Sequence, residues 1–304
     1  MLSVCFEMRF MLYFEKISSD FLKANRTVLK KNDTRLCDYS IGCLYLWSEH
    51  FNTLGCVEND TFFSMVYSET SDMFSYCFPI GNDAEAALKL IADDANSRKI
   101  SPSFCYVPEE KLESVFSVFG MPKEVFFSED WQDYLYPYKN FLGYNGKKLH
   151  TPRNHTNTFK RNYESRFEAL SPLNVEIAKS FLINNRLEFS KGDTLSDAEL
   201  DKAVNLIDEA LCMGLSGGLL YVGNECIGLT MGEVISDTLH IHTEKALKAY
   251  DGSFQMLAMN FAAMMQAPHI SYINRQEDMG LEGLRRSKLS YRPCALLKKY
   301  SLKY

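Results

Sequence analysis

The sequence predicts an α/β protein of two similar units in tandem, each with a mixed, mostly antiparallel central sheet. Three observations support this fold class. Residues 176–302 read as two helices, three strands, helix, strand, helix and strand, the order of a helix-covered mixed sheet. Residues 61–120 repeat the later part of that order. The chain has 304 residues, 46% of them hydrophobic and 24% charged, which suits two globular domains and excludes a disordered chain.

The second half contains the clearest elements. Helical apolar spacing predicts helices over Glu176–Leu187 and Asp197–Met213, the latter opened by Ser196 as N-cap with Glu199 completing a capping box. Two-residue turns separate the next strand-like runs and predict an antiparallel meander. The remaining segments read as a helix, a strand, a helix and a last strand. In order, these elements occupy 219–222, 226–235, 238–246, 254–264, 269–274, 281–289 and 295–302.

The first half repeats the pattern, with strands, a helix, a strand and a helix at 61–68, 73–80, 83–95, 102–107 and 108–120. Between the halves, 139–154 reads as a loop and His155–Ala169 as a connecting helix. The boundary is therefore placed at Asn145. This gives an N-terminal domain, 1–145, and a C-terminal domain, 146–304, which we expect to contain the active site.

Charge is distributed unevenly along this acidic chain, whose net charge is −6. Gly146–Tyr163 carries five Lys or Arg and no acid, and Arg285–Tyr304 carries seven and no acid. Two such stretches can form a polyanion-binding surface or can simply be solvated faces. The candidate polyanion-binding residues are Lys147, Lys148, Arg153, Lys160 and Arg161.

The cysteine pattern and the N-terminal sequence indicate the cellular compartment of the protein. Nine cysteines without a C-x-x-C pair favour buried free thiols in a reducing cytoplasm over disulfides or a zinc site. The first sixteen residues mix apolar with charged side chains, unlike a signal peptide. No apolar run approaches the about 18 residues of a membrane-spanning helix. We expect a cytoplasmic protein that can also associate peripherally with a membrane.

A polar row marks the strand at 238–246. Alternation places His240, His242 and Glu244 on one face. They can line a polar cleft, serve as structural histidines with internal partners, or bind a metal. We expect a cleft without a metal, in which His242 or Glu244 acts as general base.

A second polar group follows the strand that ends at Asn274. Strand ends beside helix N-termini are common ligand sites in α/β folds. Asp278 can cap the next helix or bind the α-amino group of a donor. Lys288 shares a helix face with Leu281 and Leu284, and can snorkel, bind phosphate or hold an oxyanion. The predicted substrate-binding residues are His240, Asn274, Arg275, Glu277, Asp278 and Arg285, with Lys288 as a third catalytic candidate.

Aromatic residues precede the first basic stretch: Tyr134, Tyr136, Tyr138 and Phe141. Aromatic side chains beside basic ones can stack the bases of a single-stranded RNA end. They can equally be edge-of-core residues. The sequence leaves both interpretations open.

Four stretches carry a family resemblance: DYSIGCLYLW (38–47), DYLYPYKNFLGYNGKKLHTPRNHTNTF (133–159), HTEKALKAYDGSFQ (242–255) and INRQEDMGLEGLRRSKLSYRP (273–293). The order of elements resembles the GNAT acyltransferase fold in tandem. The stretches resemble the family related to the C-terminal domain of phosphatidylglycerol lysyltransferase, akin to Fem-type aminoacyltransferases. The resemblance implies transfer of an amino acid from aminoacyl-tRNA to an amine or hydroxyl acceptor, which can be a phospholipid at the membrane surface.

One stretch departs from CoA-dependent GNAT enzymes, whose Q/R-x-x-G-x-G/A loop cradles pyrophosphate. Here Lys248–Phe254 keeps a single glycine, Gly252, and adds the negative charge of Asp251. The tyrosine that protonates a leaving thiolate in such enzymes is not evident either. CoA is therefore disfavoured, and no cofactor is expected. Two alternatives stay open: a CoA-dependent N-acyltransferase with a degenerate loop, and a catalytically silent module that binds RNA or anionic lipid.

Overall fold

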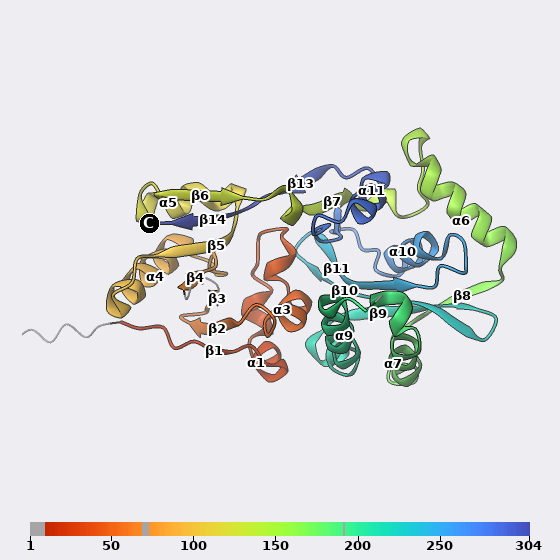
Figure 1. Cartoon of the computed structure of the whole chain (residues 1–304), viewed down its shortest axis with the longest axis horizontal. Coiled ribbons are helices and arrows are strands. Elements are labelled where there is room, and N and C mark those ends of the chain that lie inside the picture. The colour runs from red at the N-terminus through yellow and green to blue at the C-terminus, as the bar shows by residue number, and fades with distance from the viewer. Residues whose placement is uncertain (1–9, 69–72, 191) are drawn as a thin grey trace, which may run out of the picture. The chain divides into compact units, whose positions relative to one another are not determined.

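The structure, a computed structural model, describes residues 10–68, 73–190 and 192–304 (Figure 1). Cys5 and most of the segment compared with a signal peptide lie outside these residues. The chain forms two compact units. The first contains the chain up to Ile17, Ser48–Ser128 and Lys298–Tyr304, and the second contains Ser18–Trp47 and Glu129–Leu297.

The first unit is built on a seven-stranded sheet with the order β1-β2-β3-β4-β5-β14-β6. Only β4 and β5 are parallel neighbours. Its strands are β1 (Glu15–Lys16), β2 (Thr53–Glu58), β3 (Thr61–Ser68), β4 (Met73–Tyr76), β5 (Ser103–Pro108), β6 (Glu124–Phe127) and β14 (Lys299–Lys303). Its helices are α4 (Ala84–Arg98), the short 3₁₀ turn η2 (Glu109–Lys111) and α5 (Leu112–Phe119).

The second unit has a seven-stranded sheet with the order β13-β7-β12-β11-β10-β9-β8, in which β11 and β12 are the parallel pair. Its strands are β7 (Asp133–Pro137), β8 (Ser165–Ala169), β9 (Ser216–Val222), β10 (Glu225–Ile235), β11 (Thr238–Ala246), β12 (Tyr272–Asn274) and β13 (Ala295–Leu297). Its helices are α1 (Ser19–Ala24), α2 (Arg26–Leu29), α3 (Ile41–Trp47), α6 (His150–Asn162), α7 (Val175–Asn184), α8 (Arg186–Ser190), α9 (Thr194–Met213), α10 (Ser253–Met264) and α11 (Glu282–Ser290). Short 3₁₀ turns are η1 (Cys37–Tyr39), η3 (Glu129–Trp131), η4 (Tyr138–Asn140) and η5 (Lys147–Leu149).

The two sheets are duplicates that exchange one strand. Each sheet begins with a four-stranded antiparallel meander, and a strand parallel to the last of these four lies next to it. The strand after that comes from the other half of the chain order. β7 follows β6 in the chain but lies between β12 and β13, whereas β14 follows β13 but lies between β5 and β6. The predicted tandem α/β fold with mixed, mostly antiparallel sheets is confirmed.

The single boundary expected at Asn145 does not match this division. Residues 129–145 belong to the second unit because β7 pairs with β12 and β13. Residues 298–304 belong to the first because β14 pairs with β5 and β6. The single last strand expected at 295–302 is therefore two strands: β13 in the second sheet and β14 in the first.

Other local expectations are met or corrected by side-chain chemistry. The meander at 219–246 is confirmed, with Gly223 and Ser236 at positive φ in its turns. Helix α9 begins earlier than expected because Asp193, not Ser196, is its N-cap, its carboxylate accepting the Ser196 N–H at 2.8 Å. The helix expected at 155–169 is α6 followed by β8, so Arg153 is helical rather than in a loop.

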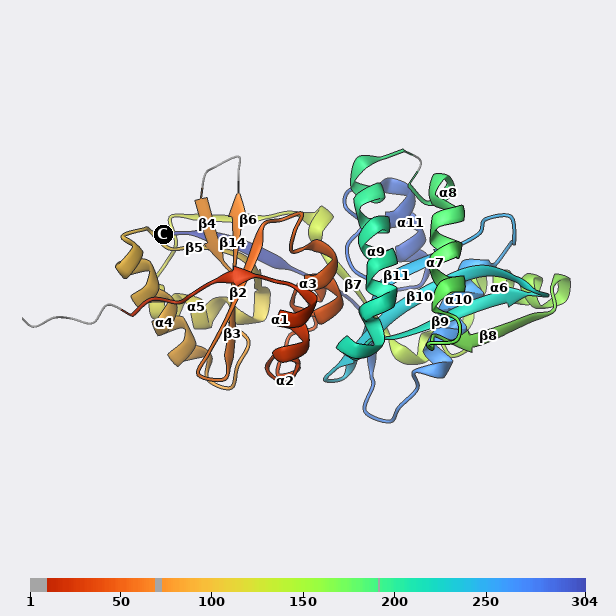
Figure 2. The same cartoon turned by 90° about the horizontal axis from the view of Figure 1, so that it is seen from below.

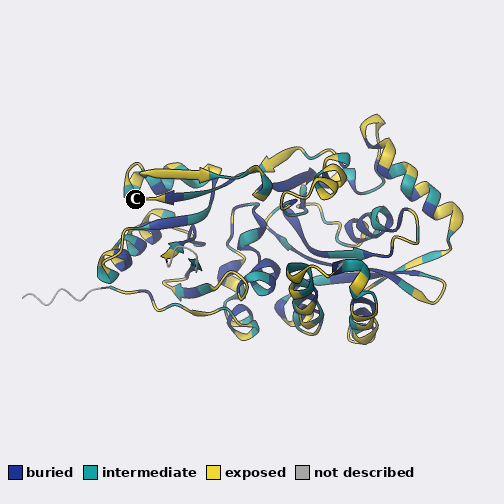
Figure 3. Cartoon of the chain, in the orientation of Figure 1, coloured by how far each residue is buried: buried dark blue, intermediate teal, exposed yellow. Residues whose placement is uncertain are grey.

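The second sheet lies between two helical layers (Figure 1). On one face, α10 covers a core that includes Leu239, Ile241, Ile273 and Phe261. On the other face lie α3, α7 and α9, and Figure 2 shows α7 and α9 in front of the sheet. The central strands β10 and β11 are buried almost throughout (Figure 3). Polar side chains in these strands must therefore find partners inside the protein.

Candidate active site

The candidate active site lies where two parallel strands of the second sheet separate. β11 and β12 pair over three residue pairs, from Thr238–Tyr272 to His240–Asn274. β12 ends at Asn274, whereas β11 continues to Ala246. Beyond His240, no described strand pairs with β11 on that side. Arg275, the first residue after β12, pairs with Glu244 of β11 at this point, and such strand ends are where α/β folds place ligands.

A β-bulge at His242 divides the polar row of β11 between the two faces. Met231 and Gly232 are consecutive in β10 but pair with Thr243 and Ile241, so His242 is an extra residue. As a result, His242 faces α3, whereas Glu244 and Ile241 border a space on the α10 side that is too tight to admit a water molecule. The predicted single face for His240, His242 and Glu244 is wrong, because strict alternation does not hold across a bulge.

His242 is held by Glu233, a residue that sequence reasoning missed. The His242 Nε2 and Glu233 Oε1 atoms lie 3.0 Å apart, and both side chains are buried. Glu233 Oε1 also accepts the Gly42 N–H at 2.8 Å. Burial alone would raise the pKa of Glu233, but the His242 and Gly42 hydrogen bonds hold it below its usual value. Glu233 is thus a buried anion that orients His242 and anchors α3.

His240 is fully buried and neutral. It pairs with Asn274 across β11 and β12, and neither of its ring nitrogens has a hydrogen-bond partner among the described residues. Burial, reinforced by His242, lowers the pKa of His240 to about 4. His240 therefore lies in the interior rather than on a cleft wall.

Asn274 fastens a distant segment to the sheet. Its Nδ2 donates to Asp133 Oδ2 at 2.7 Å and to the Arg35 carbonyl at 2.6 Å. The same Asp133 oxygen accepts the Cys37 N–H at 2.7 Å. Asn274 and Asp133 are both buried, so these contacts position residues 35–37 and leave little of Asn274 for a substrate. Asp133 carried no local sequence signal, because its partners are far away in the chain.

Glu244 and Arg275 meet on the α10 side of the opening. They form an ion pair, with 10% and 13% of their side chains exposed. The Arg275 guanidinium carbon lies 4.6 Å from the centre of the Tyr291 ring and 5.6 Å from that of Phe141. Its Nη1 is buried and has no acceptor in the described part of the chain. A carboxylate is thus next to an unused guanidinium donor.

Lys288 is buried in α11, and its ammonium is fully used. Its Nζ donates to the carbonyls of Arg275, Gln276 and Glu277 at 2.5, 3.1 and 2.5 Å. Burial, with the nearby Arg275, lowers the pKa of Lys288 to about 8. Leu281 and Leu284, expected on the same buried face, are exposed instead. Lys288 shapes the loop and does not snorkel.

Asp278 and Arg285 fasten the same loop. Arg285 donates from Nε to Asp278 Oδ2 at 2.8 Å and from Nη2 to Asp130 Oδ1 at 2.6 Å. The Tyr134 hydroxyl donates to Asp278 at 2.5 Å. Asp278 does not cap α11, whose N-cap is Leu281 without a side-chain bond. Its Oδ1 instead accepts the Gly280 N–H at 2.9 Å.

Glu277 belongs to a group with Cys37 and Asp133, whose possible ligand atoms all lie within 4.8 Å of one another. The Cys37 thiol donates to Glu277 at 3.7 Å. A hydrogen bond with Cys43 and burial raise the pKa of Cys37, so the thiol keeps its proton. The Lys288 cation interacts electrostatically with all three groups. A protonated thiol beside an ammonium is a poor fit for a divalent metal ion.

The basic stretches behave differently from each other. Lys147, Lys148, Lys160 and Arg161 are exposed, and none has an ion-pair partner within the described ranges. Arg153 is half-buried, and its Nη1 donates to the carbonyls of Tyr144 and Gly146 at 3.2 and 3.0 Å, so part of its guanidinium is engaged within the protein.

The second basic stretch is divided between the two units. Arg285 and Lys288 are engaged as described above, and Lys298–Tyr304 belongs to the first unit. Arg292 contacts the first stretch, its Nε donating to the Lys148 carbonyl at 3.4 Å.

The aromatic residues near 134–141 are core residues. Tyr134, Tyr136, Tyr138 and Phe141 are all buried in the α10-side core, with Tyr136 donating to the Lys288 carbonyl at 2.9 Å. Burial raises the pKa of Tyr134 and Tyr138 to about 12. Their rings are therefore not available to stack bases.

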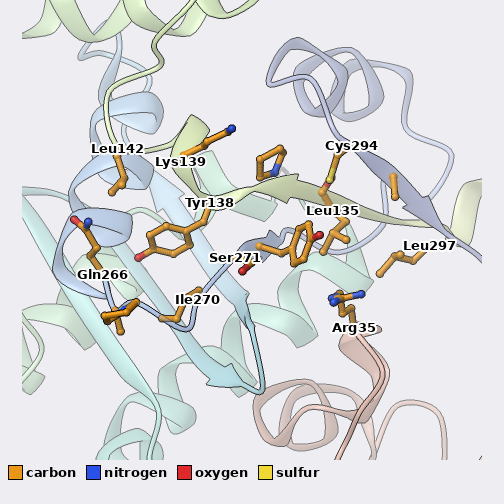
Figure 4. A pocket seen from close by; sticks show the side chains of 15 residues that line it. Arg35, Leu135, Tyr138, Lys139, Leu142, Gln266, Ile270, Ser271, Cys294 and Leu297 are labelled. Carbon is orange, nitrogen blue, oxygen red and sulfur yellow. The ribbon is translucent and has the colours of Figure 1, made fainter.

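A pocket of about 850 Å³ opens elsewhere in the second unit, beside β7 and the segment that leads into β12 (Figure 4). Leu135, Tyr138, Ile270 and Leu297 give it apolar walls, and Arg35 lies at its edge. None of the residues predicted for the site lines it. The opening at Glu244 and Arg275 therefore remains the candidate site.

The turn between β11 and α10 is covered by α6. Gly252 has φ +86°, and a Cβ on it would lie 2.3 Å from the His155 carbonyl oxygen. Asp251 Oδ1 lies 3.1 Å from His155 Nδ1. The His155 carbonyl oxygen therefore lies close to Gly252, the N-cap of α10, and Asp251 adds a negative charge next to it, which disfavours phosphate at this helix N-terminus.

Residues 30–303 match the family model "Phosphatidylglycerol lysyltransferase, C-terminal", and the chain belongs to this family. The fold is the tandem GNAT fold. A conserved protein of unknown function from Bacteroides thetaiotaomicron is similar, with 27% identity, a TM-score of 0.83 and coverage of 96% of this chain and 99% of that one. L-PGS from Bacillus licheniformis shares the fold at 11% identity and a TM-score of 0.65, covering 92% and 91%. FemX shares the fold at 9% identity and a TM-score of 0.58, with coverage of 96% of this chain and 98% of that one.

A curated relative, an uncharacterized protein of Mycoplasmoides gallisepticum, is 29% identical over 184 residues. The match spans 58% of this chain and 57% of that relative. Among the described residues, no helix is both long enough and apolar enough to cross a membrane.

Proposed function

We propose that this protein transfers an aminoacyl group from aminoacyl-tRNA to an amine or hydroxyl acceptor, and that the reaction takes place at the opening between β11 and β12. The observation that carries the proposal is the Glu244–Arg275 pair. It combines a carboxylate with a buried guanidinium nitrogen that has no acceptor in the described residues. A proton acceptor beside an unused hydrogen-bond donor is what acyl transfer requires.

The chemistry assigns one role to each partner. The acceptor nitrogen or oxygen attacks the ester carbonyl carbon, and Glu244 takes the proton that the acceptor loses. Arg275 Nη1 donates to the oxyanion that forms. When the bond to the tRNA ribose breaks, the proton passes from Glu244 to the departing ribose oxygen. No covalent enzyme intermediate and no metal is needed.

His242 and Lys288 take supporting roles in this proposal. His242 is buried on the other face of the sheet, so Glu244 is the better placed of the two base candidates. Lys288 already donates to three carbonyls and holds the Arg275 backbone in place. Loss of either residue should therefore disturb the site without removing the base.

Two features support a tRNA donor over CoA. The N-cap of α10, Gly252, packs against the His155 carbonyl of α6, and the adjacent Asp251 is acidic, which disfavours a phosphate at this turn. The exposed residues Lys147, Lys148, Lys160 and Arg161 offer contacts to an RNA backbone. A tRNA donor places the reaction in the cytoplasm. The family context includes lipid acceptors, and we include a phospholipid among the acceptors to be tested.

A transfer assay tests the proposal. The full chain is incubated with tRNA carrying radiolabelled amino acids, and with either anionic phospholipid vesicles or a mixture of primary amines and peptides. We expect labelled product from one of these acceptors. Glu244→Gln should lower kcat by at least about 100-fold with little change in KM, because general-base catalysis contributes about 10²–10⁴. Glu282→Gln, in the exposed first turn of α11, is the matched control and should retain full activity.

The alternatives give different results. Acetylation of an amine from acetyl-CoA, without transfer from tRNA, would identify a CoA-dependent N-acyltransferase. RNA or lipid binding without any transfer would identify a silent binding module. Full activity of Glu244→Gln would leave the reaction class in place but reject Glu244 as the base.

A further inference from the structure

Two thiols face each other in the first unit. The proposed function uses residues of the second unit and does not involve them. The Sγ atoms of Cys77 and Cys105 lie 3.7 Å apart. Cys105 is in β5, and Cys77 directly follows β4. Neither cysteine is in a disulfide in the structure, and Cys77 is buried whereas Cys105 is partly exposed.

The register of the two strands explains why the thiols meet. β4 and β5 are parallel neighbours, with Tyr76 paired with Phe104. Cys77 and Cys105 each follow one member of this pair, and Ser75 and Ser103 each precede one. The two serine Oγ atoms lie 2.9 Å apart, so side chains on this face point toward each other across the strands. The Cys77 N–H is held by the Ser64 carbonyl at 2.8 Å, which fixes the backbone on that side.

This arrangement is close to that of a disulfide. Bonded cysteines have Cα atoms about 4.4–6.8 Å apart, and neighbouring strands lie about 4.8 Å apart. The backbone spacing is therefore already suitable. The sulfur atoms need only approach from 3.7 Å to the bonded separation of about 2.05 Å, which side-chain rotation can supply.

We propose that Cys77 and Cys105 are a redox-modification site. The two cysteines form a reversible disulfide with each other, and the oxidant is a low-molecular-weight disulfide such as oxidised glutathione. The partly exposed Cys105 thiolate attacks one sulfur of oxidised glutathione, which breaks its S–S bond and releases one glutathione thiolate. The Cys77 thiolate then attacks Cys105 Sγ and releases the second. The two cysteine thiols are oxidised by two electrons, the reagent is reduced to two thiols, and their protons pass through solvent to the glutathione produced.

The bond would link β4 to β5 at the carboxyl end of β4, beyond the Tyr76–Phe104 pair. It would close a loop that includes all of α4. Cross-linking this loop restricts the unfolded chain, so the oxidised protein should melt at a higher temperature than the reduced protein.

Native full-length protein, equilibrated with oxidised glutathione and then blocked with an alkylating reagent, tests the proposal. Of the nine cysteines, we expect two to be lost from a thiol titration, and a non-reducing peptide map should contain the Cys77 peptide joined to the Cys105 peptide. Dithiothreitol should restore both thiols and the lower Tm. Cys77→Ser should retain an accessible Cys105 that carries one glutathione, whereas Cys212→Ser, at an exposed position outside the pair, should oxidise like the wild type.

Three outcomes would overturn the proposal. The first is an unchanged thiol titre in the native protein. The second is a peptide map that joins other cysteines, such as the neighbouring Cys37 and Cys43. The third is formation of the Cys77–Cys105 bond only after denaturant is added. The wild-type map decides among these results even if a serine variant folds poorly.

Discussion

Gly42 and His242 are packed so closely that a Cβ on Gly42 would lie 2.2 Å from His242 Cδ2. The Gly42 N–H also donates to Glu233, the carboxylate that holds His242. The first turn of α3 is thereby fitted onto the bulge of β11. This contact joins a helix from the first half of the sequence to the centre of the second sheet.

Gly42→Ala should therefore destabilise the protein, by about 1–3 kcal/mol, because the added methyl group overpacks a buried contact. Urea unfolding and calorimetry measure the loss. Gly283→Ala is the matched control, since Gly283 is exposed in α11 and a Cβ there meets nothing within 4 Å. That change should be neutral or gain up to about 1 kcal/mol of helix propensity. Equal stability of the two variants would contradict the packing of α3 on His242.

His240 predicts how stability changes in mild acid. The pKa of His240 is about 6.5 in the unfolded chain, whereas burial lowers it to about 4 in the folded protein. Between these values unfolding takes up a proton, so the free energy of unfolding should fall as pH decreases, by up to about 3 kcal/mol. Denaturation measured from pH 7 to 4 tests this. His240→Asn should flatten the curve, and His150→Asn, at an exposed position, should leave it unchanged. Parallel curves for wild type and His240→Asn would contradict burial of a neutral His240.

The limits of sequence reasoning follow from which contacts are local. The meander at 219–246 was predictable because its turns and alternation are local. The bulge at His242 was not, since it depends on how β10 and β11 pair. Asp133 was missed because its partner Cys37 is more than 90 residues away, and Glu233 because its contact with His242 depends on the bulge and its contact with Gly42 is more than 90 residues distant. The exchange of β7 and β14 was hidden for the same reason, because a strand carries no mark of the sheet that it joins.

Lys288→Met should destabilise the protein by about 2–4 kcal/mol, because it leaves three carbonyl groups without their buried donor. The loop that carries Arg275 should also loosen, which faster amide hydrogen exchange at 275–278 would report. Arg286→Met is the control, since Arg286 is exposed in the same helix. If Lys288→Met is as stable as Arg286→Met, the ammonium does not hold this loop.

Acetyl-CoA should bind more weakly than about 1 mM, a binding free energy of only about −4 kcal/mol. The His155 carbonyl lies close to Gly252, the N-cap of α10, and Asp251 next to it carries a negative charge, at the place where the pyrophosphate would lie. Isothermal titration calorimetry measures the affinity. Asp251→Gly should not restore binding, because the backbone of α6 still covers the turn. Micromolar affinity in the wild type would instead favour the N-acyltransferase.

Lys147 and Lys148 should contribute to RNA affinity and to its dependence on salt concentration. Each phosphate contact to a single strand contributes about 0.7 to the slope of log K against log salt. Replacing both exposed lysines by alanine should therefore weaken RNA binding and reduce that slope by about 1.4. It should leave Tm nearly unchanged, because solvated surface positions usually contribute within about 0.5 kcal/mol.

Arg153→Ala separates charge from structure in the same stretch. It removes one positive charge but also the donor to the Tyr144 and Gly146 carbonyls, so it should lower Tm. Its effect on the salt slope should be small, because the guanidinium already serves these carbonyls. Fluorescence titration of a tRNA acceptor-stem oligonucleotide at several salt concentrations measures both variants. An unchanged slope after loss of Lys147 and Lys148 would place RNA binding elsewhere and remove the physical support that this stretch gives to a tRNA donor.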